Sequence, residues 1–463
     1  MKKKLTFSEY IYIASMLFGL FFGAGNLIFP VHMGQMAGAK VWPAILGFLV
    51  TGVGLPLLGV AALGISRSSG LFELGSRVSK PYSMFFTCLL YLTIGPFFAI
   101  PRCANTAFTV GIENILPEGS NVQLYLFIFS LVFFGLALFF SLRPGKILIW
   151  VGKILNPAFL LFLAILVVVA MFNPSATVSE VIPEGSYATQ SFFTGFLEGY
   201  NTMDALASLA FGIVVVRVIN GLGVNEPNDV ASSTVKSGIF SCAFMALIYI
   251  AITIVGTQSR GAFATSANGG IALAQIAQYY LGNVGLIVLA CTVTLACLKT
   301  SVGLITSCAE TFSGLFAKGP SYKLWTIIFS LMSFLFANFG LNSIISYSIP
   351  VLMFLYPLAI TLILLSLCGK FFDYDKSVFV CVTVFTLIPA VYDLIASLPE
   401  GLFNAIGGPA IKSVMVKILP FSDLGLGWLC PALLGLVIGL VIHFTKKKPA
   451  SENTLLNILK MKK

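Results

Sequence analysis

Long apolar stretches alternate with short polar connections along the whole chain, and many of these stretches have the length of a membrane-spanning helix. A helix needs about 20 apolar residues to cross the roughly 30 Å of hydrocarbon in a bilayer. The pattern predicts an all-α integral membrane protein with about twelve transmembrane helices, whose ends are placed to within about 2 to 4 residues. The predicted spans lie near residues 8–37, 42–65, 79–115, 122–142, 145–172, 189–218, 232–257, 284–316, 323–340, 342–369, 377–397 and 424–444.

The first predicted span contains helix-breaking residues near its middle, in the stretch FFGAGNLIFP from Phe21 to Pro30. Hydrocarbon tolerates unwound backbone only where it is buried in protein or lines a polar cavity. Gly23 and Gly25 lack a Cβ and allow the backbone to turn or to approach a ligand, while Pro30 offers no N–H to the Asn26 carbonyl. Glycines of this kind also form packing faces between membrane helices. Taken alone, the stretch fits both a binding site and a packing face.

The sixth predicted span has a second interruption, the polar segment EGYNTMD at residues 198–204. Ionisable residues at this depth are costly and usually mark a functional site or an internal pair. The two interrupted spans stand five spans apart, and because five is odd, the two halves of the chain would lie inverted in the membrane. Paired broken helices at corresponding positions of inverted repeats indicate a secondary transporter with a binding site near the bilayer midplane.

Composition and charge agree with a membrane protein. Of the 463 residues, 58% are hydrophobic and only 10% are charged, which is too little charge to cover the surface of a soluble protein of this length. The net charge of +10 would suit a nucleic-acid partner, but the basic residues cluster in every second connection between apolar stretches. This alternation follows the positive-inside rule and predicts that both termini are cytoplasmic. We therefore expect contact with the lipid bilayer, at most an attraction to anionic lipid, and no nucleic-acid partner.

Enzymatic and metal chemistry find little support in the sequence. The nine cysteines lie in apolar stretches, none of them in a C-x-x-C pair, and with only two histidines their spacing builds no zinc or redox site. No H-E-x-x-H motif or usable Ser-His dyad is present. A channel is less suitable than a carrier, because a selectivity ring usually comes from several subunits. We expect a protein that is not an enzyme.

Four motifs, in order along the chain, resemble those of one transporter family. They are GAGNLIFP at residues 23–30, GPFFAIPR at residues 95–102, EGYNTMDALASLAFG at residues 198–212 and LACLKTSVGLITSCAE at residues 295–310. Over essentially its whole length the chain resembles the bacterial branched-chain amino acid:cation symporters of the BrnQ type, which belong to the amino acid-polyamine-organocation superfamily.

The resemblance implies a LeuT-like fold with two inverted five-helix repeats, discontinuous helices 1 and 6, and two further C-terminal helices. Residues 1–172 would form the first repeat, residues 189–369 the second, and residues 370–463 the last two helices with a basic cytoplasmic tail. The implied function is sodium-coupled import of leucine, isoleucine and valine across the bacterial cell membrane by alternating access. The alternative is a proton-coupled or cation-independent carrier of different specificity. We expect a monomer, although no sequence feature determines the oligomeric state.

A zwitterionic substrate needs a partner for each of its charges, and the two interruptions offer both. N–H groups freed at the first interruption, at the positive end of a half-helix, suit a carboxylate. Freed carbonyls near Tyr200 and Asn201, or the carboxylate of Asp204, suit the ammonium group. The predicted substrate-binding residues are Gly23, Ala24, Gly25, Asn26, Tyr200, Asn201, Met203 and Asp204. Candidates for an apolar wall are Met203, Phe21, Phe22, Phe97 and Phe98. Ordinary packing is the alternative for each of these apolar residues.

A cation site is indicated in the eighth span. Cys297, Thr300 and Ser301 stand at positions i, i+3 and i+4, so one carbonyl and two hydroxyls share a helix face. Hard cations prefer oxygen ligands, and the resemblance implies a sodium ion between this face and the carbonyls of Gly19 and Phe22. A Thr-Ser pair in an apolar helix more often bonds to its own i−4 carbonyl, which is the alternative. Sodium is the expected coupling ion, and we expect no organic cofactor.

Two charged residues within the predicted spans have partners that the sequence leaves open. For Arg102, the candidates are Glu198, Asp204 and Glu310. Lys299 departs from the family pattern, and an ammonium group facing the ion would repel or replace it. At 100° per residue, Lys299 lies about 150° around the helix from the three cation candidates of the eighth span. We therefore expect it to point away from them, paired or reaching toward water.

A Lys299→Ala variant should keep sodium-dependent uptake, because a side chain on the far side of the helix does not replace the ion. The measurement is uptake of labelled leucine by proteoliposomes at graded sodium concentrations, with the unchanged protein as the reference. Complete loss of sodium dependence in the variant would contradict the predicted orientation.

Overall fold

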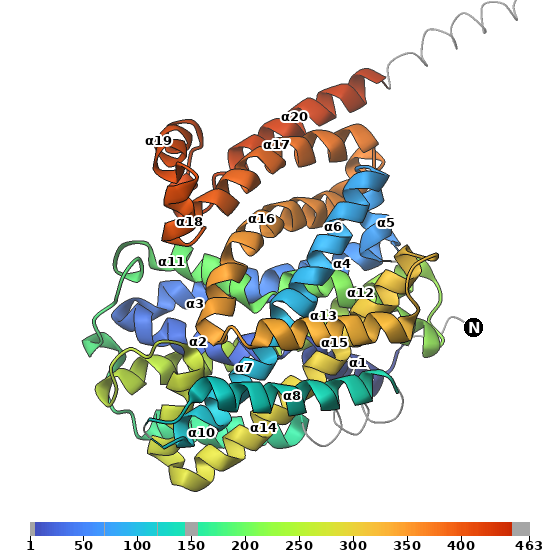
Figure 1. The fold of residues 1–463 in the computed structure, drawn as a ribbon. Helices are drawn as coiled ribbons and strands as arrows, with labels where there is room; N and C mark the ends of the chain where they lie inside the picture. Colours follow the sequence, from blue (N-terminus) through green and yellow to red (C-terminus); the bar gives the residue numbers. More distant parts are fainter. Residues whose placement is uncertain (1–4, 69, 118, 144–155, 447–463) are drawn as a thin grey trace, which may run out of the picture.

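The computed structural model describes residues 5–68, 70–117, 119–143 and 156–446, and every regular element in these ranges is helical (Figure 1). The N-terminal elements are α1 (Phe7–Phe21), α2 (Gly25–Ala37), α3 (Val41–Leu49), α4 (Leu55–Ser66), α5 (Leu71–Ser76), α6 (Lys80–Leu92), α7 (Ala99–Gly111), α8 (Val122–Ser141) and α10 (Asn156–Phe172). They are followed by α11 (Tyr187–Glu198), α12 (Asp204–Gly221), α13 (Pro227–Gln258), α14 (Gly269–Leu315), α15 (Tyr322–Ala337), α16 (Leu341–Cys368), α17 (Lys376–Ala396), α18 (Glu400–Ala405), α19 (Gly408–Ile418) and α20 (Leu429–Lys446). The all-α class predicted from the hydrophobic pattern is confirmed.

Many of the helices are suited to crossing a membrane. Within the described residues, eight are long and apolar enough, and a ninth qualifies if the bent pair Asp204–Phe211 and Val214–Gly221 is one span. Two further apolar helices, Leu160–Phe172 and Tyr322–Ala337, are shorter. The predicted fifth span, 145–172, begins outside the described residues. The protein is therefore a multi-pass membrane protein, and the count of about twelve spans stays a prediction.

The first predicted span is broken at its glycines. α1 ends at Phe21, residues 22–24 are not helical, and α2 starts at Gly25. Pro30 lies inside α2, so the break is shorter than the stretch that predicted it. Because α2 is buried along almost its whole length, protein rather than lipid surrounds the unwound backbone.

The sixth predicted span is broken at its polar segment. α11 ends at Glu198, a 3-10 turn covers Gly199–Thr202, and α12 starts at Asp204. Met203 joins the turn to α12 with a φ of 63°, in the left-handed region that residues other than glycine rarely adopt. Both interruptions predicted from the sequence are therefore breaks in the helical backbone.

The third predicted span also changes course. α6 continues into a π-helical turn, Thr93–Phe97, in which Gly95 has non-helical backbone angles, and α7 starts at Ala99. π-helical turns are frequent at functional sites. The turn places Arg102 at the start of α7, in the interior of the bundle.

α2 lies against α13 with almost no side chain between the two backbones. A Cβ built on Gly34 would be 2.0 Å from the Thr253 carbonyl oxygen, and one built on Gly256 would be 2.2 Å from the Val31 carbonyl oxygen. Small residues at such crossings allow membrane helices to approach closely. α14 packs on both α2 and α7, and α12 packs on α13 (Figure 1). The helices that begin at the two breaks, α2 and α12, are therefore packed against other helices of the bundle.

The last helices form a pair beside the rest of the bundle. α17 packs along α20, and α18 and α19 lie at one end of this pair (Figure 1). Asp375, which caps α17, lies 3.2 Å from His443 of α20. The pair coincides with the two predicted C-terminal helices. The predicted division of the chain into two repeats and a C-terminal part stays a prediction, and nearly all of the basic tail lies outside the described residues.

Gly34→Ala should destabilise the protein by about 1 to 3 kcal/mol, because the added Cβ overlaps the Thr253 backbone and pushes α2 away from α13. The matched control is Gly303→Ala in α14, where an added Cβ meets no atom within 4 Å. This control should be neutral or stabilising, since alanine is the better helix former. Thermal unfolding of the purified proteins in detergent measures both changes. Equal midpoints for the two variants would contradict the described packing.

Candidate functional site

Three buried side chains tie the two helix breaks together. Asn26, near the start of α2, donates from Nδ2 to Asp204 Oδ2 at 2.5 Å and also to the Tyr249 hydroxyl. The Tyr249 hydroxyl, on α13, donates to the same Asp204 oxygen at 3.0 Å. Each of the three residues is at most 2% exposed. Because a buried polar group is costly unless it is hydrogen bonded, this network holds the start of α12 against the start of α2.

Asn26 also satisfies the backbone of the break that precedes it. Its Oδ1 accepts the Gly23 N–H at 2.8 Å, so this N–H is not available to a ligand. Ala24 lies beside the Cys103 sulfur. The N–H groups of Gly25 and Asn26 meet no acceptor in the described part of the chain. These two amides, at the positive end of the α2 dipole, therefore remain for a carboxylate.

Arg102 links the third predicted span to the second break. Its side chain is buried, and Nη1 donates to the Asn201 carbonyl at 2.6 Å. Nη2 lies 3.5 Å from the Thr202 carbonyl, and the guanidinium carbon lies 5.0 Å from the centre of the Phe29 ring. The three carboxylates that the sequence offered as partners form no ion pair with Arg102 within the described ranges. Backbone carbonyls take their place.

A cavity between the two breaks contains most of the predicted substrate site. It is lined by Phe21, Gly23, Ala24, Gly25, Asn26, Ile94, Ala99, Arg102, Cys103, Thr202, Met203, Asp204, Ala207, Phe211, Thr300 and Leu304. Six of the eight predicted substrate residues are among them. Arg102 and Asp204 bring opposite charges to the cavity, and much of the remaining wall is apolar. Such a combination orients a small amphiphilic ligand.

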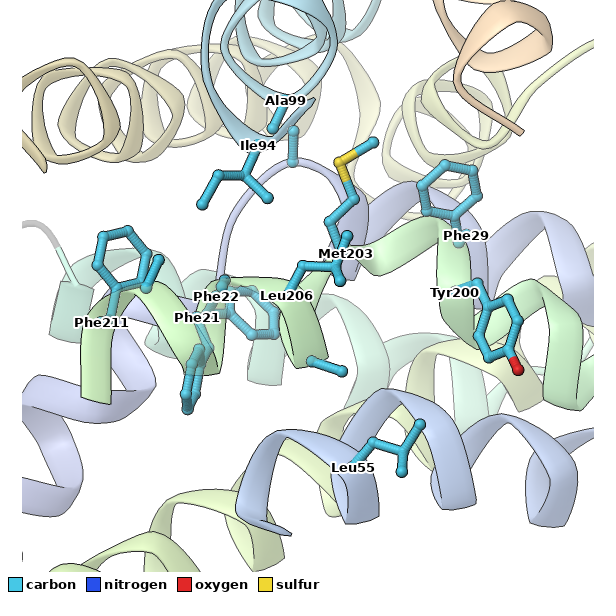
Figure 2. Close-up of a cluster of buried hydrophobic side chains, with 14 of the residues drawn as sticks. Phe21, Phe22, Phe29, Leu55, Ile94, Ala99, Tyr200, Met203, Leu206 and Phe211 are labelled. Atoms are coloured by element: carbon cyan, nitrogen blue, oxygen red, sulfur yellow. The ribbon is translucent and has the colours of Figure 1, made fainter. Parts of the chain in front are cut away.

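Figure 2 shows a cluster of buried hydrophobic side chains, five of whose labelled residues line the cavity: Phe21, Ile94, Ala99, Met203 and Phe211. Ile94 and Ala99 lie together, and Phe211 and Phe29 lie on opposite sides of Met203. Of the apolar candidates from the sequence, Phe21 and Met203 line the cavity, and three pack outside it: Phe22, Phe97 and Phe98. For these three, the ordinary-packing alternative describes their position.

Two predicted substrate residues, Tyr200 and Asn201, lie outside the cavity lining. Tyr200 stacks on Tyr356 of α16, with the ring centres 3.9 Å apart. The Asn201 side chain donates to Glu198 Oε2 at 3.3 Å. The Asn201 carbonyl, which we expected to be free for an ammonium group, accepts the hydrogen bond from Arg102 instead.

The predicted cation face of α14 lies against the first break. A Cβ built on Gly23 would be 3.3 Å from Thr300 Cγ2 and 3.6 Å from its Oγ1. Thr300 Oγ1 donates to the Ala296 carbonyl at 3.1 Å, which is the i−4 bond considered as the alternative. Ser301 Oγ is buried and has no hydrogen-bond partner among the described residues. Both oxygens keep lone pairs for a ligand, because donating a hydrogen bond does not use the acceptor capacity of a hydroxyl.

The remaining predicted ligands lie on the same helix as these hydroxyls or at the end of α1. Cys297 is buried one turn before Ser301, and Phe22 caps α1. Because the Gly23 N–H bonds to the Asn26 side chain, it does not satisfy the Gly19 carbonyl four residues earlier. An oxygen at the end of α1 is thus left without its helical donor. The orientation of Lys299, which does not line the cavity, stays a prediction.

Further cavities flank the central one. One has Ile28, Phe29, His32, Glu198, Asn201 and Asn268 in its lining. Another has Phe72, Glu73, Tyr91, Ala210, Val214 and Glu310 in its lining. The first of these cavities is next to the central one, because Phe29 lines it and the Arg102 guanidinium over the Phe29 ring lines the central cavity. The second flanking cavity is also next to the central one, because Ala210 lines it and the adjacent residue Phe211 lines the central cavity.

Two residues of the site carry little signal in the sequence. Tyr249 lies in an apolar stretch where a tyrosine fits ordinary packing, and only its depth in a span indicates that its hydroxyl needs a partner. Cys103 follows Arg102 directly and lies beside the side chains of Cys297 and Ser301. Both residues become visible as parts of the site only once the helices are packed.

Broken helices that meet at a buried cavity are typical of secondary transporters, and solved structures of transporters share this fold. Mhp1, a nucleobase-cation-symport-1 family transporter solved in a closed conformation with bromovinylhydantoin bound, has a TM-score of 0.56 and 15% identity, covering 95% of this chain and 93% of its own. MhsT in complex with L-phenylalanine has a TM-score of 0.56 and 16% identity, and the match covers 95% of this chain and 99% of the MhsT chain. At these identities the likeness establishes the LeuT-like fold alone.

Sequence relatives cover the chain almost completely. The profile of the family described as branched-chain amino acid transport protein matches residues 6–446. The branched-chain amino acid permease BrnQ of Lactobacillus delbrueckii subsp. lactis is 52% identical over 93% of this chain and 96% of its own length. BrnQ of Bacillus subtilis is 41% identical over 97% and 100%, and the branched-chain amino acid transport system 2 carrier protein of Pseudomonas aeruginosa is 39% identical over 94% and 96%. The chain therefore belongs to the branched-chain amino acid transport protein family, which confirms the resemblance in the four motifs, and it is a transport protein, not an enzyme.

Asn26→Leu should destabilise the protein by about 2 to 4 kcal/mol, because it leaves the Gly23 N–H unsatisfied and removes one of the two donors to Asp204. Tyr249→Phe, which removes only a hydroxyl from the same network, should cost less. Thermal unfolding of the purified variants in detergent measures both. An Asn26→Leu protein as stable as the Tyr249→Phe protein would show that the asparagine does not hold the breaks together.

Proposed function

We propose that this protein is a sodium-coupled symporter that imports leucine, isoleucine and valine by alternating access. The observation that carries the proposal is the cavity at the two breaks, where Asp204 and Arg102 lie beside an apolar wall. A branched-chain amino acid combines an ammonium group, a carboxylate and a short aliphatic side chain, and so matches this lining. The names of the relatives, which are permeases and carriers of branched-chain amino acids, support the substrate class.

The substrate lies between the two breaks in this proposal. Its carboxylate binds at the start of α2, where the Gly25 and Asn26 N–H groups have no acceptor in the described chain. Its ammonium group binds the Asp204 carboxylate, which Asn26 and Tyr249 already orient. Its side chain contacts the apolar lining, which includes Phe21, Ile94, Met203, Phe211 and Leu304. The three substrates differ by the placement or number of methyl groups, which a pocket distinguishes by only about 1 to 3 kcal/mol each.

The sodium ion lies between the end of α1 and the facing side of α14 in this proposal. The carbonyls of Gly19, Phe22 and Cys297 and the hydroxyls of Thr300 and Ser301 supply oxygen ligands, which a hard cation prefers. The contact of Thr300 with the first break and the unpartnered hydroxyl of Ser301 support this position. Because the same break borders the substrate, the ion and the amino acid raise each other's affinity.

Alternating access requires a path from each side of the membrane to the central cavity. The two flanking cavities support this part of the proposal, since each lies next to residues of the central lining. The charge pattern of the connections supports cytoplasmic termini in a bacterial cell membrane. A proton-coupled or cation-independent carrier is the competing proposal.

Proteoliposomes containing the purified protein should take up labelled leucine faster, and to a higher level, when an inward sodium gradient is imposed. Replacing both hydroxyls, in Thr300→Ala with Ser301→Ala, should raise the sodium concentration that gives half-maximal uptake by about tenfold or more, because two oxygen ligands are lost. The matched control is Ser313→Ala, an exposed hydroxyl on the same helix.

Uptake that ignores the sodium gradient and follows an imposed proton gradient would contradict sodium coupling and favour the competing carrier. An unchanged sodium requirement in the double variant would remove Thr300 and Ser301 as ligands, while leaving amino acid transport itself untouched.

A further inference from the structure

Arg102 carries a buried charge that its neighbours satisfy on one side only. Nη1 donates to the Asn201 carbonyl at 2.6 Å, whereas Nη2 is 3.5 Å from the Thr202 carbonyl, which is long for a hydrogen bond. Nε is buried and has no partner among the described residues. Nε and Nη2 form one edge of the planar guanidinium group. Arg102 is therefore anchored through Nη1, and its other edge lacks a good acceptor.

The weakly bonded edge lies against the start of α2. A Cβ built on Gly25 would be 2.9 Å from Arg102 Nη2 and 3.4 Å from Cζ, so the guanidinium rests on the backbone of the first residue of the helix. The Gly25 and Asn26 N–H groups at this helix end meet no acceptor in the described chain, and the helix dipole is positive here. A buried cation and a helix N-terminus thus lie side by side.

These two positive groups lie at a cavity without a carboxylate paired to either of them. Within the described ranges, Arg102 forms no ion pair. Asp204 lines the same cavity, but its Oδ2 is engaged by Asn26 and Tyr249 at the other break. Unpaired charge in a site of low dielectric is costly. The arrangement therefore favours an anionic group that enters from outside the chain.

We propose that Arg102 is a substrate-binding residue, whose Nε and Nη2 hold the carboxylate of the transported amino acid opposite the Gly25 and Asn26 N–H groups. The inference rests on the proposed function, because it assigns a further residue to the same substrate site. Two parallel hydrogen bonds from arginine to a carboxylate are strong and geometrically specific. Nη1 keeps its bond to the Asn201 carbonyl, so the bound carboxylate connects the first break to the second through Arg102.

A requirement for a free carboxylate follows from this assignment. L-leucinol has the ammonium group and the aliphatic side chain of leucine, but an alcohol replaces the carboxylate. It keeps the contacts to Asp204 and to the apolar wall and loses those to Arg102. The competing role for Arg102 is a structural cross-link between α7 and the second break, and loss of a cross-link weakens the binding of both ligands alike. The ratio of the two affinities therefore distinguishes the roles.

The test measures binding of L-leucine and of L-leucinol to the purified protein in sodium-containing detergent solution by isothermal titration calorimetry. Arg102→Met should weaken leucine binding by about 10- to 100-fold, because hydrogen bonds to a charged group are lost, and it should leave leucinol binding unchanged. Arg102→Lys should keep part of the preference for leucine, since an ammonium group keeps the charge without the planar fork.

Arg77→Met is the matched control. Arg77 also donates to a backbone carbonyl, that of Ser66 at 2.8 Å, and also lies over an aromatic ring, that of Tyr374 at 4.1 Å, but it does not line the central cavity. This variant should leave the ratio of leucine to leucinol affinity unchanged. It therefore controls for the general effect of removing a guanidinium group that is bonded to backbone.

Unchanged leucine affinity in Arg102→Met, or an equal loss of leucine and leucinol affinity, would overturn the assignment. If the methionine variant does not fold, Arg102→Lys decides by the same ratio, and failure of even this variant to fold would give Arg102 the structural role and overturn the proposal. An unchanged protein that binds no branched-chain amino acid would instead overturn the proposed function.

Discussion

Backbone that leaves the helical path inside a bilayer must find its hydrogen-bond partners within the protein, and in this transporter Asn26 meets that requirement. Its amide oxygen accepts the Gly23 N–H, and its amide nitrogen bonds to Asp204 at the other break. A single side chain thus satisfies the first break and attaches it to the second. The close glycine contacts at Gly34 and Gly256 hold α2 directly against α13.

The two charges of the cavity are held by neutral groups rather than by each other. Asp204 accepts from an amide and a phenol, and Arg102 donates to backbone carbonyls. An internal ion pair would have cancelled both charges, and a zwitterion would then have had to break that pair before binding. Neutral partners fix the positions of the two side chains and leave their charges effective. In the proposed binding mode, the two side chains therefore meet the two ends of an amino acid without a large rearrangement of their own charges.

The features that could be predicted from the sequence are those set by local chemistry. Apolar stretches predict the helices, and the glycines of the first span and the polar residues of the sixth predict the breaks, since each depends on residues close together in the chain. Six of the eight substrate candidates reach the cavity for the same reason. The partners of Arg102 could not be predicted, because a backbone carbonyl about one hundred residues away has no sequence signature. The positions of Tyr200 and Asn201 outside the cavity lining depend on a 3-10 turn followed by a left-handed residue, which the residue types do not reveal.

The left-handed backbone at Met203 has a consequence for how finely the site can select. This conformation costs a residue with a Cβ about 1 to 2 kcal/mol, and glycine would remove the cost. Glycine would also remove the thioether side chain that lines the cavity together with Arg102 and Asp204. Methionine is unbranched and adjusts its shape to neighbours that differ by a methyl group. In the proposed binding mode, the second break thus combines backbone strain with an adaptable surface beside the substrate, and such a surface suits a class of aliphatic side chains rather than a single one.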